Sequence, residues 1–453
     1  MQYALKTKAV VNRHGFCYTG DPMTKSAIRG SVLTFIADPF YNDPAASYRY
    51  IEDALVVMEN GLIQSVAEYK PEAAQGLAVE HFPDAVICPG FVDCHLHYPQ
   101  TQMIGAFGEQ LIEWLNTYTF VAEQDFANLS HAQRVARIFL AELLRCGTTT
   151  ASVYCTVHPQ SVEAFFETSF ELGTRMIAGK VMMDRNAPEA LLDNAETAYS
   201  DSLRLLEKWH NHGRQLYAVT PRFAPTSTPD ELRAAARLWY EHPGTYLQTH
   251  LSENLGELAW VKELFPECDR YLEVYKKYNL IGPRSVFGHC IHLDEEDFAD
   301  FNGSGASMAH CPTSNLFLGS GFFKLYEAKN AARPVKVGLG TDVGGGTSFS
   351  ILRTLGEAYK VAQMNQTRLN SIQGFYLATR GGAEALDLAD RLGSVAPGFE
   401  ADLVVLDLKA TPLIEFRMEF AKTLAEKLFV LMTIGDDRAV RATYVAGRKV
   451  HGR

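Results

Sequence analysis

The chain has 453 residues with a formal net charge of −11, and 47% of its residues are hydrophobic. This composition is typical of a globular protein with a large core. The acidic charge, together with the lack of any Lys/Arg-rich tract, argues against a nucleic-acid partner, because phosphate contacts need basic residues. A small-molecule ligand is compatible with this charge.

The N-terminal MQYALKTKAVVNRHG contains no apolar run like the core of a signal peptide, and no stretch is apolar enough to span a bilayer. The eight cysteines are scattered and form no CxxC pair. Such cysteines are typical of reduced, mostly buried thiols. We therefore expect a cytoplasmic protein without a membrane partner.

Residues 1–85 are predicted to be rich in β-structure. Segment 54–69 alternates apolar and polar residues around a hairpin-type turn at Glu59-Asn60-Gly61. Residues 395–453 return to this pattern, with ADLVVLDL at 401–408. Both chain ends are therefore predicted to be rich in β-strands.

Residues 86–394 alternate short apolar strand candidates with helix-length amphipathic segments such as 131–147 and 229–242. The strand candidates are 85–97, 148–154, 175–183, 216–223, 245–253, 285–291, 306–311 and 335–342. The alternation predicts an α/β fold, a (β/α)8 barrel, although an open doubly wound sheet would show it too. The barrel is favoured because polar residues cluster at strand ends and no glycine-rich phosphate loop follows the first long strand.

The strongest single motif is Asp93-Cys94-His95-Leu96-His97, which ends an apolar run. Residues i and i+2 of a strand point to the same face, so His95 and His97 could present two imidazoles to one metal ion. An HxH triplet also arises by chance in a chain with 14 histidines. Its position at a strand end favours the metal site.

Further candidates end later strands, namely His250, His289 and Asp342, and Glu253 follows three residues after His250. A non-ligand glutamate beside a metal site can shuttle protons. Taken singly, Glu253 could be a helix N-terminal residue and Asp342 a turn or cap residue. Their regular order on separate strand ends favours one shared site.

These motifs resemble those of a known superfamily. PGFVDCHLH at 89–97 resembles the opening motif of the amidohydrolase superfamily, and THLSE, GHC and GLGTD resemble later positions of its mononuclear deaminase branch. The resemblance implies a barrel over about residues 84–398. It also implies a smaller composite β-sandwich domain built from both chain ends, 1–85 and 395–453, with the barrel over 86–394.

A narrower resemblance is to the guanine deaminase family within that branch. It is carried by HLHYPQ, LIEWLNTYTFVAE, GKVMMDRNAP, TPRFAPT, THLSEN and MAHCPTSNLFLGSG. It implies a purine-base pocket that contains His97, Tyr98, Pro99, Gln100, Arg222, Phe223, His250, Glu253 and Asp342. Arg222 could bind the O6 and N7 acceptors of guanine, and Phe223 could stack on the ring. Considered alone, the two would more often be a salt-bridge partner and a core residue.

The resemblance implies that His95, His97, His250 and Asp342 hold one divalent ion per subunit. Zn²⁺ is expected, and Fe²⁺ would suit the same ligands. Glu253 would accept a proton from the activated water and deliver it to the ring nitrogen next to C2. Asp342 would help to protonate the departing amino group. His289 would orient the attacking group, or it would be a further ligand.

Other interpretations stay open. Lys180 lies near the position where some amidohydrolases carbamylate a lysine to bridge two metals. The substrate could be cytosine, an adenosine-like nucleoside, a triazine or an oxidised purine. The chain could also be a catalytically inactive barrel used as an interaction module. The reaction that the resemblance implies is the hydrolysis of guanine to xanthine and ammonia. The resemblance also implies a homodimer.

Overall fold

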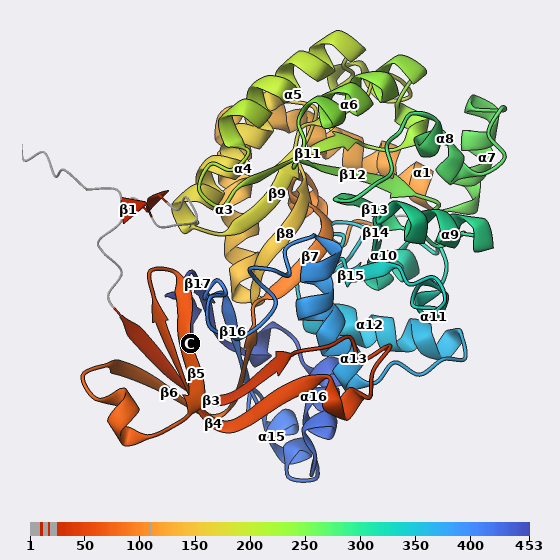
Figure 1. Cartoon of the computed structure of the whole chain (residues 1–453). Coiled ribbons are helices and arrows are strands. Elements are labelled where there is room, and N and C mark those ends of the chain that lie inside the picture. The colour runs from red at the N-terminus through yellow and green to blue at the C-terminus, as the bar shows by residue number, and fades with distance from the viewer. Residues whose placement is uncertain (1–9, 12–16, 19–24, 108–109) are drawn as a thin grey trace, which may run out of the picture.

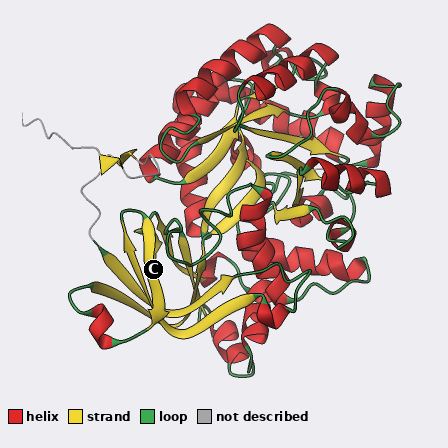
Figure 2. Ribbon diagram, viewed as in Figure 1, coloured by secondary structure: helices red, strands yellow, loops and turns green. Residues whose placement is uncertain are grey.

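The computed structural model describes residues 10–11, 17–18, 25–107 and 110–453. Its larger part is a barrel of parallel strands surrounded by helices, and a second sheet lies beside the barrel (Figure 1). Figure 2 shows the strands inside the ring of helices. The predicted α/β class, with a (β/α)8 barrel and a smaller sheet domain built from both chain ends, is confirmed.

The barrel strands follow each other in chain order, and every pairing between them is parallel. They are β7 Phe91–His97, β8 Thr148–Tyr154, β9 Arg175–Gly179, β11 Leu216–Pro221, β12 Tyr246–Leu251, β13 Ser285–His289, β14 Ser307–His310 and β15 Lys336–Leu339. The short strand β10 Val181–Met182 also pairs with β11 in parallel. All residues of β7, β8 and β12 are buried. Parallel strands that are covered on both faces need such continuous apolar runs, which explains the sequence pattern.

The first and last barrel strands meet through the backbone just beyond β15. Asp342 N donates to His95 O at 2.9 Å, and His97 N donates to Val343 O at 2.8 Å. Closure of the barrel therefore brings the HxH motif next to Asp342. Two residues that are far apart in the sequence become neighbours at the carboxyl ends of the strands.

Helices cover the outside of the barrel. The longest one, α3, begins after Asn128, whose side chain accepts a hydrogen bond from His131 N at 3.2 Å. Val135, Phe139 and Leu143 recur at four-residue steps along it and are buried against the strands. The helices are α3 Leu129–Arg145, α4 Pro159–Leu172, α5 Ala195–Trp209, α6 Pro229–Glu241, α7 Leu255–Leu264, α8 Tyr271–Lys277, α9 Glu295–Ser304, α10 Pro312–Phe317, α11 Leu325–Ala328, α12 Ile351–Met364, α13 Ser371–Tyr376 and α14 Gly382–Ala385.

The second sheet combines strands from both chain ends. Its order is β18 Arg448–Gly452, β17 Val440–Val445, β16 Leu403–Asp407, β6 Ala78–Pro89, β3 Ser26–Phe35, β4 Tyr48–Glu59 and β5 Leu62–Glu68. The predicted turn at Asn60-Gly61 joins β4 to β5, and both residues have positive φ, 54° and 79°. A two-residue hairpin turn needs this backbone, which asparagine and glycine tolerate best. The predicted boundaries after residues 85 and 394 stay a prediction.

The remaining elements are short or flank the two sheets. They are β1 Val10–Val11, β2 Cys17–Tyr18, α1 Leu111–Trp114, a π-helical turn Leu115–Thr119, α2 Phe120–Gln124, α15 Pro412–Met418 and α16 Leu424–Ile434. In the part of the chain that the structure describes, no helix combines the length and the apolar character needed to cross a membrane. The cysteines from Cys88 to Cys311 are buried and unpaired.

A buried ionic network joins the amino-terminal face of the barrel to the second sheet. Arg175, the first residue of β9, donates from Nε to Glu400 Oε2 at 2.8 Å, and Arg214 donates to Asp402 Oδ2 at 2.6 Å. All four side chains are about 3% exposed. Burial acts to raise the pKa of Glu400, but the charges of Arg175 and Arg214 lower it to about 2. Glu400 therefore stays ionised throughout the neutral and mildly acidic range.

We expect Arg175→Ala to lower the free energy of unfolding by about 3–5 kcal/mol, because Glu400 loses a partner while it remains buried. Urea unfolding followed by circular dichroism measures the loss. Arg29→Ala, which removes an exposed pair with Asp53, is the control and should change the midpoint much less. Equal shifts in the two variants would contradict a stabilising role for the buried network.

Candidate active site

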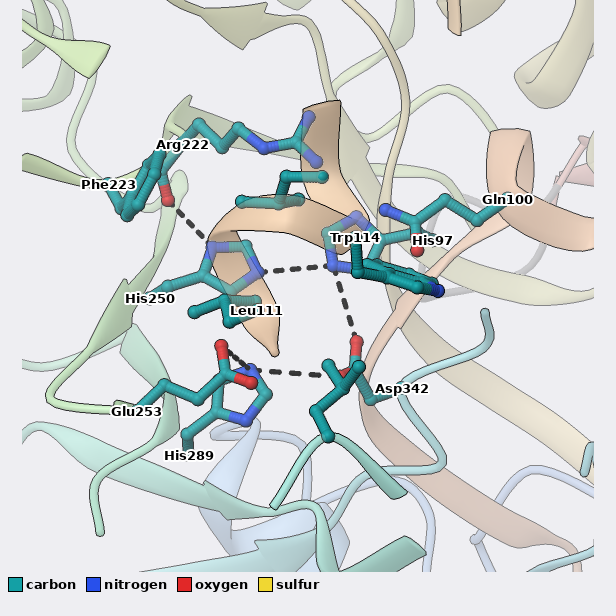
Figure 3. Close-up of a pocket in the computed structure, with 12 residues that line it drawn as sticks. His97, Gln100, Leu111, Trp114, Arg222, Phe223, His250, Glu253, His289 and Asp342 are labelled. Carbon is teal, nitrogen blue, oxygen red and sulfur yellow. Dashed lines mark hydrogen bonds and ion pairs between the residues drawn. The ribbon is translucent and has the colours of Figure 1, made fainter. Parts of the chain in front are cut away.

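The predicted metal-ligating side chains converge at the carboxyl ends of the barrel strands. The Nε2 atoms of His97 and His250 lie 3.1 Å apart, and Asp342 Oδ1 lies 3.4 Å from Nε2 of both His95 and His97. His289 Nε2 is 3.7 Å from Asp342 Oδ2. Figure 3 shows His97, His250, His289 and Asp342 facing one space. Strand ends that are distant in sequence thus supply one cluster.

Hydrogen bonds on the outer side of two imidazoles fix which nitrogen faces the cluster. His250 Nδ1 lies 2.7 Å from the carbonyl oxygen of Arg222, and His289 Nδ1 lies 2.8 Å from Asn315 Oδ1. These acceptors hold the proton on Nδ1 and leave Nε2 with a free lone pair. Such outer partners are typical of metal-ligating histidines.

The buried Nε2 atoms of His95 and His289 have no hydrogen-bond partner among the described residues. Buried polar atoms are almost always paired, because desolvation without a partner is costly. Ligand atoms of His95, His97 and Asp342 lie within 4.8 Å of one another, as do those of His95, His250 and His289. The unpaired nitrogens and the mixed imidazole and carboxylate donors therefore fit a bound divalent cation.

The backbone at these strand ends adopts conformations that are rare for residues with side chains. Ser252, His289, Cys290 and Asp342 have φ values of 52°, 68°, 52° and 49°. Left-handed backbone at non-glycine residues costs free energy and clusters at functional sites. In return, His289 and Asp342 are turned toward the cluster. Gly288 supplies space, since a Cβ atom there would lie 2.6 Å from His95 Cε1.

Burial keeps the imidazoles neutral. Desolvation lowers the pKa of His95, lowers that of His97 to about 3, and lowers that of His250 well below its usual value. Neutral imidazole is the form that binds a metal. Burial would raise the pKa of Asp342, yet the nearby imidazoles of His95 and His97 hold it well below its usual range. The cluster thus offers neutral nitrogens and one anionic oxygen.

Glu253 has the opposite electrostatic setting. It is 3% exposed, and burial together with the charge of Asp342 raises its pKa well above the usual value. Its carboxylate lies 3.4 Å from His289 Nε2 and accepts a hydrogen bond from Ser320 Oγ at 3.2 Å. A buried carboxyl with a raised pKa can carry a proton at neutral pH.

A cavity opens onto the cluster, and its empty space of about 380 Å³ includes the part that is open to solvent. Predicted residues in its wall include Gln100, Arg222 and Phe223, which are labelled in Figure 3. The full lining is His97, Gln100, Leu111, Trp114, Leu115, Arg222, Phe223, His250, Glu253, His289, Leu318 and Asp342.

Two of the residues expected in the base pocket lie outside this lining. Tyr98 is fully buried, and its hydroxyl donates to Ser161 O at 2.7 Å. Its ring packs edge-on against Phe126 at 5.2 Å between centroids. Pro99 is buried in the short 3-10 helix Tyr98–Met103 that follows β7. The turn of the chain after His97 directs these side chains into the core.

Several residues of the site were not singled out in the sequence. Leu111, Trp114 and Leu115 close one side of the cavity, and Glu123 contacts Arg222 from behind. They lie in LIEWLNTYTFVAE, so the resemblance of that segment was the available signal. Their individual roles depend on contacts between distant parts of the chain, which periodicity does not reveal.

Lys180 lies away from the cavity lining. Its side chain is fully buried, and Nζ pairs with Asp193 and donates to Val181 O at 3.3 Å. Its partner Asp193 belongs to neither of the metal-ligand groups found among the described residues. This placement gives no support to a bridging role for the lysine.

Comparison with known proteins agrees with this geometry. The model of the amidohydrolase family matches residues 86–450. Guanine deaminase of Escherichia coli strain K12 is 50% identical over 436 residues, which cover 95% of this chain and 98% of that protein. The chain belongs to the guanine deaminase family of amidohydrolases. The predicted family is thereby confirmed.

Solved structures show the same relationship for this amidohydrolase. The structure of the Escherichia coli guanine deaminase matches with a TM-score of 0.91 and 49% identity, and covers 94% of this chain and 100% of its own. A guanine deaminase from C. acetobutylicum, with guanine bound in its active site, matches with a TM-score of 0.85 and 27% identity over 94% of this chain and 100% of its own. The chain is therefore a metal-dependent amidohydrolase of this family.

We expect His250→Ala to lose most of its bound metal, because one of the few converging nitrogens is removed. Metal content of the purified variant, measured by inductively coupled plasma mass spectrometry, checks this. His81→Ala changes an exposed histidine on β6 and should keep its metal. Unchanged metal content in His250→Ala would exclude that imidazole as a ligand.

Proposed function

We propose that this amidohydrolase hydrolyses guanine to xanthine and ammonia. The observation that carries the proposal is the composition of one cavity. Its wall joins a cluster of metal-type ligands and the proton-carrying Glu253 to the hydrogen-bond donors of Arg222 and Gln100. Water activation, proton transfer and recognition of a polar heterocycle therefore have residues in the same space.

His95, His97, His250 and Asp342 would hold one divalent ion per subunit. We propose Zn²⁺, since imidazole and carboxylate donors suit it, and Fe²⁺ would suit the same donors. When bound, such an ion lowers the pKa of a water ligand toward about 7 and so supplies a nucleophile at neutral pH. The positive φ angles at His289 and Asp342 would direct these side chains toward the ion.

Glu253 would move the proton that the reaction needs. Its raised pKa lets it take a proton from the attacking water and deliver it to the ring nitrogen next to C2 of guanine. His289, at 3.4 Å from Glu253, would orient the attacking group or stabilise developing charge. Asp342 would pass a proton to the amino group at C2, which then leaves as ammonia.

The other end of the cavity would recognise the base. Arg222 and Gln100 can donate to O6 and N7 of guanine, which lie on the edge remote from C2. Phe223, 4% exposed and next to Arg222, offers a ring face for stacking. In this proposal Tyr98 and Pro99 support His97 and Gln100 from the core. We further infer a cytoplasmic homodimer.

The direct experiment is an assay of the purified protein with guanine. We expect equal amounts of xanthine and ammonia, detected by chromatography and by coupled ammonia measurement. Activity should disappear after chelation and return when Zn²⁺ is restored. A metal-replete protein that releases no ammonia from guanine would refute the proposal.

For Glu253→Gln we expect turnover to fall by about 10²–10⁴-fold, because the amide cannot shuttle a proton. Metal content should stay normal, since Glu253 is not among the proposed ligands. Steady-state kinetics together with metal analysis measure both quantities. Glu263→Gln, an exposed change on α7, is the matched control. Near-normal turnover in metal-replete Glu253→Gln would exclude the shuttle role.

For Arg222→Ala we expect mainly a higher KM for guanine, because a forked donor to the base is lost while the proton path is intact. The variant also leaves Glu123 buried without its cation, so its fold must be checked by circular dichroism. If KM and kcat for guanine both stayed at the normal level, Arg222 would not contact the base.

A further inference from the structure

Glu123 is a buried carboxylate that the reaction itself does not use. It lies in α2, is 0% exposed, and accepts hydrogen bonds from Arg222 Nη1 at 2.9 and 2.7 Å. Both bonds come from the same nitrogen of the guanidinium. Among the described residues, Nε and Nη2 of Arg222 make no hydrogen bond to the protein, and Arg222 lines the cavity. Those remaining donors are available to a ligand.

Glu123 also fixes the side-chain amide of Gln100. The amide oxygen of Gln100 accepts from Gly344 N at 3.1 Å, and its Nε2 faces Glu123 Oε1 at 3.5 Å. A backbone N–H can only donate and a carboxylate can only accept, so the two neighbours permit a single orientation of the amide. One N–H of Gln100 therefore faces Glu123, and the other is left for the cavity that Gln100 and Arg222 both line.

A cavity end that carries only donors selects a ligand edge that carries acceptors. Figure 3 shows Arg222 and Gln100 at one end of the pocket and Glu253 and His289 at the other. If the reacting carbon of a purine base lies beside Glu253, the opposite edge of the base faces the N–H groups of Arg222 and Gln100. A keto oxygen and a ring nitrogen on that edge are acceptors, whereas an amino group would oppose donor to donor.

We propose that Glu123 is a positioning residue that sets substrate specificity. It holds Arg222 and Gln100 so that this end of the cavity presents only hydrogen-bond donors, which we call the donor-only edge. Such an edge accepts 6-oxopurines and rejects 6-aminopurines. This inference rests on the proposed function and deepens it. Glu123 acts through the two side chains and touches no substrate atom. Its negative charge and its accepting oxygens are both required, because a neutral amide at this position could donate and would remove one of the two contacts that fix the orientation of Gln100.

The test compares guanine with 2,6-diaminopurine, which keeps the 2-amino group and has an amino group in place of O6. Hydrolysis at C2 releases one ammonia from each, and gives xanthine from guanine and 2-hydroxy-6-aminopurine from the analogue. For the unmodified protein we expect kcat/KM to favour guanine by at least about 10²-fold, because unpaired buried polar groups penalise the analogue. Comparable kcat/KM values for the two bases would overturn the donor-only edge without any variant being made.

For Glu123→Gln we expect KM for guanine to rise about 10-fold or more, a smaller change in kcat, and a preference for guanine that falls at least about 10-fold. Metal content should stay normal. Glu113→Gln, an exposed change on the preceding helix α1, is the matched control and should keep the preference. Glu123→Asp keeps the charge and should restore part of the preference, and it serves as the second variant if Glu123→Gln does not fold.

The outcomes separate this inference from the proposed function. If the unmodified protein does not deaminate guanine, the proposed function fails whatever the variants do. If it prefers guanine and Glu123→Gln loses activity on both bases equally, Glu123 is only a structural partner of Arg222 and the inference fails alone. A selective loss of the preference, partly restored in Glu123→Asp, supports it.

Discussion

The convergence of His95, His97, His250 and Asp342 on one buried space is the constraint on which the rest of the structure depends. Neutral imidazoles and an anionic carboxylate are costly to bury without partners, and the Nε2 atoms of His95 and His289 have no hydrogen-bond partner among the described residues. The cluster lies at the ends of barrel strands whose residues are fully buried, such as β7 and β12. Positive φ angles at His289 and Asp342 show that the backbone also adapts to the cluster.

Stability and chemistry are placed at opposite ends of the barrel. At the amino-terminal face, Arg175 and Arg214 are paired with Glu400 and Asp402, and the pKa of Glu400 is lowered as a result. At the carboxyl face, charged groups are left with incomplete partners and shifted pKa values. The second sheet contacts the barrel at its amino-terminal face through this ionic network. It can therefore stabilise the barrel without entering the cavity.

Two buried glutamates in the same cavity region illustrate how surroundings decide function. Glu253 pairs with no lysine or arginine among the described residues, and burial raises its pKa and makes it suitable for proton transfer. Glu123 faces the guanidinium of Arg222 and can only organise donors around it. A buried glutamate thus suits proton transfer in one place, whereas in the other it orients neighbouring side chains.

The sequence by itself determined the barrel, the strand-end positions of the metal-type ligands and the family. Strand periodicity already places His95 and His97 on one face, and the order of His250, His289 and Asp342 follows the alternation of strands and helices. Only the tertiary structure decided which side chains beyond the motifs reach the cavity. Tyr98 adjoins His97 in sequence yet lies in the core, while Glu123 meets Arg222 across 99 residues. Local patterns specify the direction of a strand, but loop paths and contacts between distant segments exist only after the barrel has closed.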